Sequence, residues 1–255
     1  MTNISVYAAE YLSMLEFMTS AEKELPEVKL FIYGESELME SLPAEAMDYF
    51  AGSFDELLSN KILVLLSPLE DESLIANYTG TVIDAVSDPL FKLLYSIVSI
   101  NEESHLTLGL PLAVYGKDGV DSLMRETRSI YTFDEDVDSV LPMRIAFNMH
   151  FYKEALPGGI WENEIAELKK YTSLNLRINP TSTVFVADIY CSEEIELPED
   201  TGFFTPETDF SFEDINSSPR IALIRSPDDK MLTLAGDYLH MKTAELIEAV
   251  KRTLS

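Results

Sequence analysis

Apolar side chains recur along the chain with two different spacings. At residues 4–18 they stand three or four positions apart, which predicts an amphipathic helix at the start of the chain. Helical patterns follow at 35–56, from about residue 67, and at 89–98, 122–128, 160–171 and 243–254. Short apolar runs that end at turn residues predict strands instead, at 28–33, 62–66, 105–115, 143–152, 174–178, 183–191, 220–225 and 230–234.

The order of these elements predicts the fold class. Helices and strands alternate in the first half of the chain, whereas strands cluster in the second half. This order predicts an α+β fold with a mixed, partly antiparallel sheet or sheets and flanking helices. We expect an acidic helix and strand half at 1–143 and a strand-rich half at 144–255 with an acidic loop at 193–214. A length of 255 residues also allows one compact domain.

Charge narrows the range of partners. The chain has 45 Asp and Glu against 18 Lys and Arg, which gives a formal net charge of -27. Because 46% of the residues are hydrophobic, a purely solvating acidic tail is excluded and a folded protein is expected. Direct binding to nucleic acid or to an anionic membrane needs clustered basic residues, so neither is expected. The charge favours a cationic partner.

Three further features predict a cytoplasmic protein. The first residues lack the basic and apolar regions of a secretory signal. The most apolar stretch, at 81–100, is broken by charged residues and proline, so no membrane span is expected. Cys191 is the only cysteine, which excludes an intramolecular disulfide and any CxxC motif and fits a reducing compartment.

Motifs for metal binding or catalysis are incomplete. Asp134, Asp136 and Asp138 match the first ligands of a calcium-binding EF-hand loop, but Ser139 and Ile145 replace its required Gly and Glu. The three histidines lack the spacing of metal ligands. Neither a GxSxG nor a GxGxxG motif occurs. The sequence therefore predicts a protein that is not an enzyme and has no cofactor or metal.

Acidic residues instead form two concentrated segments. Residues 1–143 hold 26 acids and seven bases, and residues 178–219 hold ten acids and no base. Carboxylates two residues apart on a strand lie about 6.6 Å from each other, and those three or four apart on a helix about 5–6 Å. Both distances resemble the step between nucleic acid phosphates. Such rows predict a decoy that occupies a basic nucleic-acid-binding surface of another protein.

The acids expected to form this partner-binding surface lie in three parts of the chain. They are Glu35, Glu37, Glu40, Asp134, Glu135, Asp136, Asp138, Glu193, Glu194, Glu196, Glu199, Asp200, Glu207, Asp209, Glu213 and Asp214. Two alternatives remain open at this point. One is a metal-dependent hydrolase that uses a carboxylate cluster, and the other is a plain acidic soluble structural protein whose charge maintains solubility.

In size, acidity and lack of enzyme motifs, the chain resembles the phage-encoded inhibitors that mimic or displace nucleic acid, most of all the degradosome-interacting proteins of giant phages. The resemblance concerns overall character and assigns no individual residue. It implies a homodimer in the host cytoplasm. Its acidic patches would cover the basic RNA-binding segments of a ribonuclease scaffold, the RNA degradosome, and block RNA turnover.

Overall fold

The computed structural model divides the chain into two compact units. Unit 1 consists of Met1–Asp88 and Lys242–Ser255, and unit 2 of Pro89–Met241. The structure describes residues 2–9, 11–34, 50–51, 53–67, 69, 71–84, 89–132, 139, 141–142, 144–159, 161–198, 204–205, 215 and 221–255. The charge pattern divided the chain at residue 143, whereas the contacts divide it at residue 88 and return it to unit 1 at residue 242.

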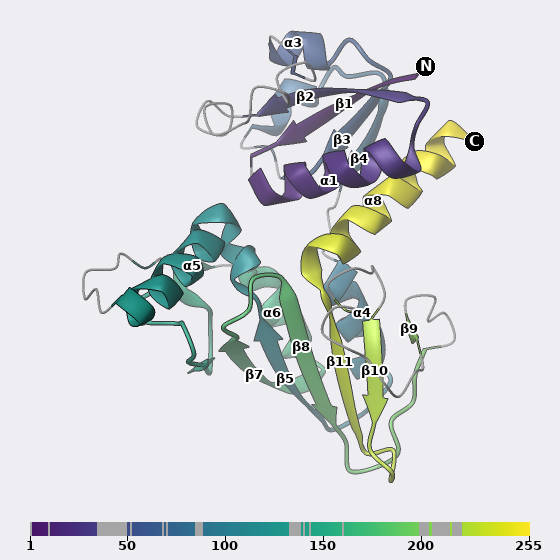
Figure 1. The fold of residues 1–255 in the computed structure, drawn as a ribbon. Coiled ribbons are helices and arrows are strands. Elements are labelled where there is room, and N and C mark those ends of the chain that lie inside the picture. The colour runs from purple at the N-terminus through teal and green to yellow at the C-terminus, as the bar shows by residue number, and fades with distance from the viewer. Residues whose placement is uncertain are drawn as a thin grey trace. The chain divides into compact units, whose positions relative to one another are not determined.

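A four-stranded parallel sheet forms the centre of unit 1, with the strand order β2-β1-β3-β4 (Figure 1). Its strands are β1 (Thr2–Ala8), β2 (Val28–Gly34), β3 (Ile62–Leu65) and β4 (Thr81–Asp84). The helical elements between them are α1 (Tyr11–Glu24), α3 (Phe54–Leu57) and the 3-10 turn η2 (Glu72–Ile75). β1 and β3 are buried over continuous runs, as expected for parallel strands that are covered on both faces.

Unit 1 has a core on each face of this sheet. On one face, Val6 packs in a cluster with Phe17 of α1 and Val250 of the last helix, α8 (Tyr238–Leu254). On the other face, Tyr7 packs in a second cluster with Leu57 of α3. Neighbouring residues of β1 thus enter different cores, because successive side chains of a strand point to opposite faces.

The helix predicted at residues 4–18 is wrong in its first part. Residues 2–8 form β1, and α1 begins only at Tyr11. The five residues Ile4–Ala8 are all buried, which a strand between two cores explains. A short apolar run of this kind cannot be told from a buried helix by spacing alone. The strands predicted at 28–33 and 62–66 are confirmed with small differences at their ends.

A seven-stranded sheet forms unit 2, with the order β6-β7-β5-β8-β11-β10-β9. Its strands are β5 (Ser104–Leu110), β6 (His150–Tyr152), β7 (Thr172–Ile178), β8 (Val184–Tyr190), β9 (Phe204–Thr205), β10 (Ile221–Arg225) and β11 (Met231–Asp237). β5 pairs with β7 and β9 with β10 in parallel, and the other neighbouring pairs are antiparallel. The predicted α+β class, with a mixed, partly antiparallel sheet and flanking helices, is therefore confirmed.

The two faces of the unit 2 sheet differ in character. One face carries buried apolar side chains such as Leu106 and Phe185. α4 (Pro89–Val98) and α6 (Glu162–Leu168) lie on the same side of this sheet in Figure 1 and bury their own apolar residues. The alternate positions of the strands, beginning with His105, are more polar and more exposed. Only one face of this sheet has the composition of a protein core.

The remaining described elements are η3 (Leu112–Tyr115), α5 (Gly116–Thr132) and η4 (Pro157–Gly159). α5 is longer than the helix predicted at 122–128, and of the strand predicted at 143–152 only the last three residues form β6. Across the described parts of the chain, no helix is long and apolar enough to cross a membrane.

A buried carboxylate stabilises the segment that precedes β6. Glu126 of α5 is almost fully buried. Its Oε2 accepts hydrogen bonds from the backbone N–H groups of Ile145 and Ala146, at 2.5 and 2.9 Å. Both of these residues are buried as well. The carboxylate thus supplies the acceptor for two backbone donors in a segment without regular secondary structure, as buried polar groups require.

We predict that Glu126→Ala lowers the free energy of unfolding by about 2–4 kcal/mol, because two buried N–H groups lose their acceptor. Glu126→Gln keeps an acceptor oxygen and should cost less. Urea unfolding followed by the fluorescence of Trp161, the only tryptophan, reports on unit 2. Asp121→Ala is the matched control, because it removes a carboxylate of the same helix that makes a surface ion pair with Lys117 and should cost about 0.5 kcal/mol or less. Equal losses for Glu126→Ala and Asp121→Ala would contradict the prediction.

Candidate functional site

A buried aspartate and a histidine lie close together where β11 meets α8. Asp237 ends β11 and is 3% exposed. Its Oδ1 accepts a hydrogen bond from the backbone N–H of His240 at 3.0 Å, so that Asp237 acts as the N-terminal cap of α8. The Oδ2 accepts a hydrogen bond from Thr183 Oγ1 at 2.6 Å. Both carboxylate oxygens therefore have donors.

The imidazole of His240 lies against the same carboxylate. Nδ1 of His240 is 3.3 Å from Oδ1 of Asp237, and the histidine side chain is 31% exposed. A carboxylate at this distance favours the tautomer that carries the proton on Nδ1. Strand pairing keeps Thr183 in place, because Val184 of β8 pairs with Asp237 and Thr183 O accepts the N–H of Tyr238 at 2.9 Å.

Opposing effects act on the pKa of Asp237. Burial by itself raises this pKa, but the hydrogen bonds from the His240 side chain and backbone and from Thr183, together with the charge of the imidazole, outweigh it and leave the pKa below its usual value. Asp237 is therefore ionised at neutral pH. A negative, buried carboxylate that holds the Nδ1 side of a histidine is the arrangement by which enzymes orient a general acid–base.

The sequence patterns do not predict this pair. His240 lacks the spacing of a metal ligand, and the apolar pattern predicts that the last helix begins at residue 243. One signal was present, because Asp237 stands at the end of an apolar strand and three positions before His240, where a helix cap would bring them together. A search for the spacing of metal ligands does not detect this capping pattern.

Of the sixteen acids predicted to form a partner-binding surface, only Glu193, Glu194 and Glu196 lie within the described residues, and all three are exposed. They line a groove of about 380 Å³ in unit 2 together with Glu102 and Glu103, which the sequence analysis did not include. The predicted residues that lie outside the described part of the chain are Glu35, Glu37, Glu40, Asp134, Glu135, Asp136, Asp138, Glu199, Asp200, Glu207, Asp209, Glu213 and Asp214.

Asn101 holds the two sides of this acidic groove together. Its Nδ2 donates to the carbonyl oxygens of Ile97 and Glu196 at 2.7 and 2.9 Å, and its Oδ1 accepts the N–H of Glu196 at 2.9 Å. Cys191 also lines the groove but is buried, which raises the pKa of its thiol and disfavours the reactive thiolate. Within the ranges that the structure describes, no group of three or more His, Cys, Asp or Glu side chains could hold a metal ion.

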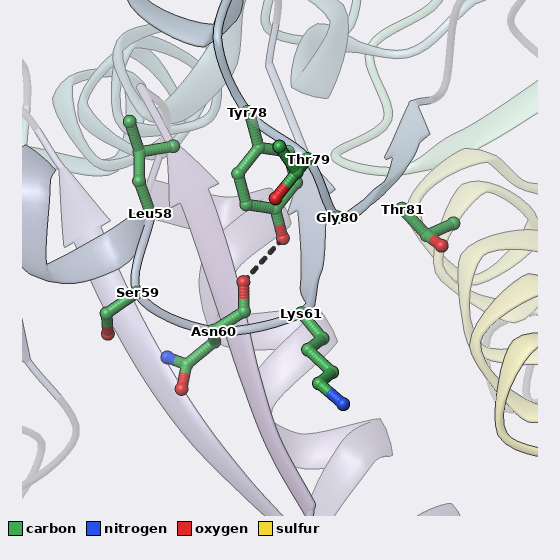
Figure 2. A pocket seen from close by; sticks show the side chains of 8 residues that line it. All are labelled: Leu58, Ser59, Asn60, Lys61, Tyr78, Thr79, Gly80 and Thr81. Carbon is green, nitrogen blue, oxygen red and sulfur yellow. Dashed lines mark hydrogen bonds between the residues drawn. The ribbon is translucent and has the colours of Figure 1, made fainter.

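A second hollow, of about 400 Å³, lies in unit 1 at the amino ends of β3 and β4 (Figure 2). Its shape is fixed by a hydrogen bond from Tyr78 Oη to Asn60 O at 2.7 Å and by Gly80, where a Cβ would come within 2.4 Å of Lys61 O. Burial raises the pKa of Tyr78. The side chains of Asn60 and Lys61 point in different directions in Figure 2. They do not converge on one ligand group, so this hollow has no arrangement for chemistry.

Comparison with known proteins identifies the architecture. No family model matches the sequence, and no curated protein matches it. Solved structures do match. A probable aspartate-semialdehyde dehydrogenase from Pseudomonas aeruginosa is 14% identical, with a TM-score of 0.62, and the match covers 100% of this chain and 99% of that one. The enzyme from Francisella tularensis is 12% identical, with a TM-score of 0.63 and full coverage of both chains.

Aspartate-semialdehyde dehydrogenase II from Vibrio cholerae, complexed with ASA, is also similar, at 12% identity, a TM-score of 0.61 and 98% coverage of both chains. At these identities the likeness shows the fold alone. It nevertheless corrects the prediction from sequence. A non-enzymatic inhibitor that mimics nucleic acid and acts on the RNA degradosome is wrong, because the chain has, over its whole length, the two-unit fold of an enzyme. That prediction rested on the net charge and on the lack of enzyme motifs, and neither of these determines the backbone fold.

A dehydrogenase fold raises the question of a nicotinamide dinucleotide. Parallel sheets bind such cofactors at the carboxyl ends of the strands where the strand order reverses, here between β1 and β3, with a glycine-rich turn that lets the pyrophosphate approach a helix. Between the end of β1 and the start of α1 the sequence reads Ala9-Glu10, without a glycine. The N–H of Ala9 donates to Ser67 Oγ at 3.1 Å. A sequence without glycine and a backbone donor that already has an acceptor do not fit a pyrophosphate.

We predict that the protein does not bind NADPH in the usual way. Titration of NADPH with the protein should give no saturable change in nicotinamide fluorescence up to about 1 mM. The physical reason is that the sequence after β1 has no glycine to allow a close backbone approach, and that the N–H of Ala9 already has an acceptor in Ser67 Oγ. Saturable enhancement at micromolar protein that added NADP⁺ reverses would show that this reading of the turn is mistaken.

We predict that Asp237→Asn separates the charge of Asp237 from its role as a helix cap, because Asn caps helices as well as Asp. The pKa of Asp237 is lowered in the folded protein, so its stabilising charge is present above the unfolded pKa of about 3.9 and is lost as the pH falls through the lower folded value. The wild type should exceed the variant by roughly 1–2 kcal/mol at pH 6. This difference should shrink below about pH 4.

Urea unfolding at a series of pH values, followed by Trp161 fluorescence, measures this difference. A gap between wild type and Asp237→Asn that stays constant down to about pH 3 would contradict a depressed pKa. So would a variant that is more stable than the wild type at neutral pH.

Proposed function

We propose that the protein is an enzyme that transfers protons at a small carbonyl substrate, with His240 as its general acid–base. One observation carries the proposal, namely that the buried, ionised Asp237 holds Nδ1 of His240 at 3.3 Å. A histidine fixed in one tautomer by a carboxylate moves protons more effectively than one that rotates freely. The likeness of fold to a class of enzymes supports the proposal at the level of architecture.

Each group has a definite role in this proposal. Nε2 of His240 takes a proton from water while the water oxygen forms a bond to the carbonyl carbon. The bond from the carbonyl carbon to the leaving group then breaks, its electron pair stays on the leaving group, and the imidazolium gives the proton to that group. Asp237 stabilises the imidazolium that results and keeps its own charge. Thr183 acts as a positioning residue, since its hydroxyl holds Oδ2 at 2.6 Å and fixes the plane of the carboxylate.

The sequence after β1 does not fit a dinucleotide, and this limits the classes of reaction that the proposal includes. With no cradle for a pyrophosphate after β1, hydride transfer to such a cofactor is not part of the proposal. Proton transfer needs only the imidazole, its carboxylate and a substrate. This places the chemistry on side chains of unit 2, because Asp237, His240 and Thr183 all belong to that unit.

We predict that the protein hydrolyses 4-nitrophenyl acetate, a general probe for an activated imidazole, faster than an equal concentration of free imidazole. His240→Gln should lower kcat/KM about 100-fold or more, the contribution expected of a general acid–base. Asp237→Asn should lower kcat roughly 10-fold or more with a smaller effect on KM, because the imidazole loses its orientation. The release of 4-nitrophenolate gives both constants.

His105→Gln is the matched control, because His105 is an exposed histidine of the same unit, and its ring centroid lies 6.5 Å from that of Tyr190. It should leave the rate within about twofold of the wild type. Far-UV circular dichroism establishes that each variant is folded. If His240→Gln keeps the wild-type rate, or if His105→Gln lowers it equally, His240 is not the general acid–base.

A further inference from the structure

An exposed phenylalanine lies in strained backbone between α5 and β6. Phe147 has a φ of 64°, in the left-handed region that bulky residues rarely adopt. The N–H of Asn148 donates to the carbonyl oxygen of Ile145 at 2.8 Å, so Phe147 is the third residue of a β-turn. A positive φ at this position favours glycine. The phenylalanine is nevertheless present and is 63% exposed, so its strain is not explained by burial of its ring in a core.

The buried carboxylate of Glu126 holds this turn in place. It accepts the N–H groups of Ile145 and Ala146, which are the first two residues of the turn. The ring of the third residue, Phe147, meets the ring of Tyr131 edge to face, with the centroids 6.3 Å apart and the planes at 83°. Tyr131 ends the exposed side of α5 and is 72% exposed. Because the two rings already support each other, a partner that covers them loses little conformational freedom at this surface.

Three exposed arginines belong to the same two segments of the chain. Arg128 lies three positions before Tyr131 on α5, and side chains at this spacing are neighbours on a helix. Arg125 and Arg144 each adjoin, in sequence, one partner of the carboxylate hydrogen bonds described above. We define the arginine–aromatic patch as Arg125, Arg128, Tyr131, Arg144 and Phe147.

The arginines of this patch differ from others in unit 2. Arg177 and Arg225 form ion pairs with Asp188 and Asp229. The three arginines of the patch have no such partner among the described residues, although the chain contains 45 acids. An unpaired guanidinium keeps its donors for a carboxylate of another molecule, which it can bind through two parallel hydrogen bonds.

Charge and apolar surface together determine which partner fits the arginine–aromatic patch. All of its charged side chains are positive, so it favours carboxylates, and its two exposed rings favour an aromatic side chain. Charges act over only about 10 Å at 0.1 M salt, so a short peptide on the patch experiences mainly the arginines. A long polyanion such as RNA would extend beyond them, and the net charge of -27 would repel it.

We infer that the arginine–aromatic patch is a docking site for an acidic peptide segment of another protein that also carries an aromatic side chain. Carboxylates of the segment bind the arginines, and its aromatic ring packs against Tyr131 and Phe147. The inference does not depend on the role of His240. The sign of the partner is opposite to the one that the net charge predicts.

Fluorescence anisotropy with a defined peptide tests the docking site. The probe is a short fluorescein-labelled peptide of glutamate and phenylalanine residues, and a peptide with glutamine in place of each glutamate is its uncharged counterpart. The full chain should bind the acidic probe saturably, with a Kd on the order of 10–100 μM, and the uncharged peptide at least about tenfold more weakly. Arg128→Glu should weaken binding of the acidic probe at least about tenfold.

Arg252→Glu is the matched control, because it makes the same change of charge at an exposed arginine of α8. It should leave the affinity within about twofold of the wild type. Phe147→Gly separates binding from folding. Glycine suits the positive φ, so this variant should keep the thermal stability of the wild type and still lose at least about tenfold in affinity.

Four outcomes would overturn the inference. The first is a lack of saturable binding of the acidic probe up to about 1 mM protein. The second is an equal loss of affinity in Arg252→Glu and Arg128→Glu. The third is wild-type affinity in Phe147→Gly. The fourth is tighter binding of oligouridylate, or of vesicles of phosphatidylserine, than of the acidic probe, because the patch would then recognise nucleic acid or membrane.

Discussion

The carboxylate of Asp237 is the constraint on which the arrangement at the end of β11 depends. It ends a strand of the unit 2 sheet, caps α8 through the N–H of His240, and accepts the hydroxyl of Thr183 beside β8. α8 then continues into unit 1, where Val250 belongs to the core that also contains Val6 and Phe17. One buried charge thus joins a strand, a helix and a histidine. Burial alone would disfavour the ionised form, so its donors are a condition for the fold as well as for any chemistry of His240.

Fold and cofactor chemistry separate clearly in this chain. Unit 1 keeps a parallel sheet whose strands are buried on both faces, and the match to dehydrogenases extends over the whole chain. The sequence that follows β1 nevertheless has no glycine where a pyrophosphate requires one. Core packing depends on apolar side chains such as Val6 and Tyr7, whereas cofactor binding depends on a few backbone groups at the sheet edge. The residues of a cofactor site can therefore differ between proteins that share the same core packing. For this reason function must be argued from the site and not from the fold.

The sequence predicted the fold class and most strands of unit 2, because alternation in segments such as 172–178 and 231–237 is a local property that burial of one face imposes. It failed at residues 2–8, where burial on both faces removes the alternation. It also failed at 144–149, where the Glu126 carboxylate, and not strand pairing, accepts the N–H groups of Ile145 and Ala146. In the sequence, Asp237 and His240 could be recognised as a pair only through the spacing of a possible helix N-cap. The contact of Asp237 with Thr183 spans 54 positions and follows from strand pairing, which no local pattern contains.

Net charge is a sum over the whole surface, whereas binding depends on the charge of one face. The value of -27 led to a decoy for basic proteins, yet the unit 2 sheet has a face on which Arg177 and Asp188 cancel. Arg177 and Asp188 stand 11 positions apart in the sequence and come together only through the pairing of β7 and β8 with β5. The charge of a face therefore depends on strand pairing, which the net charge of the chain does not contain.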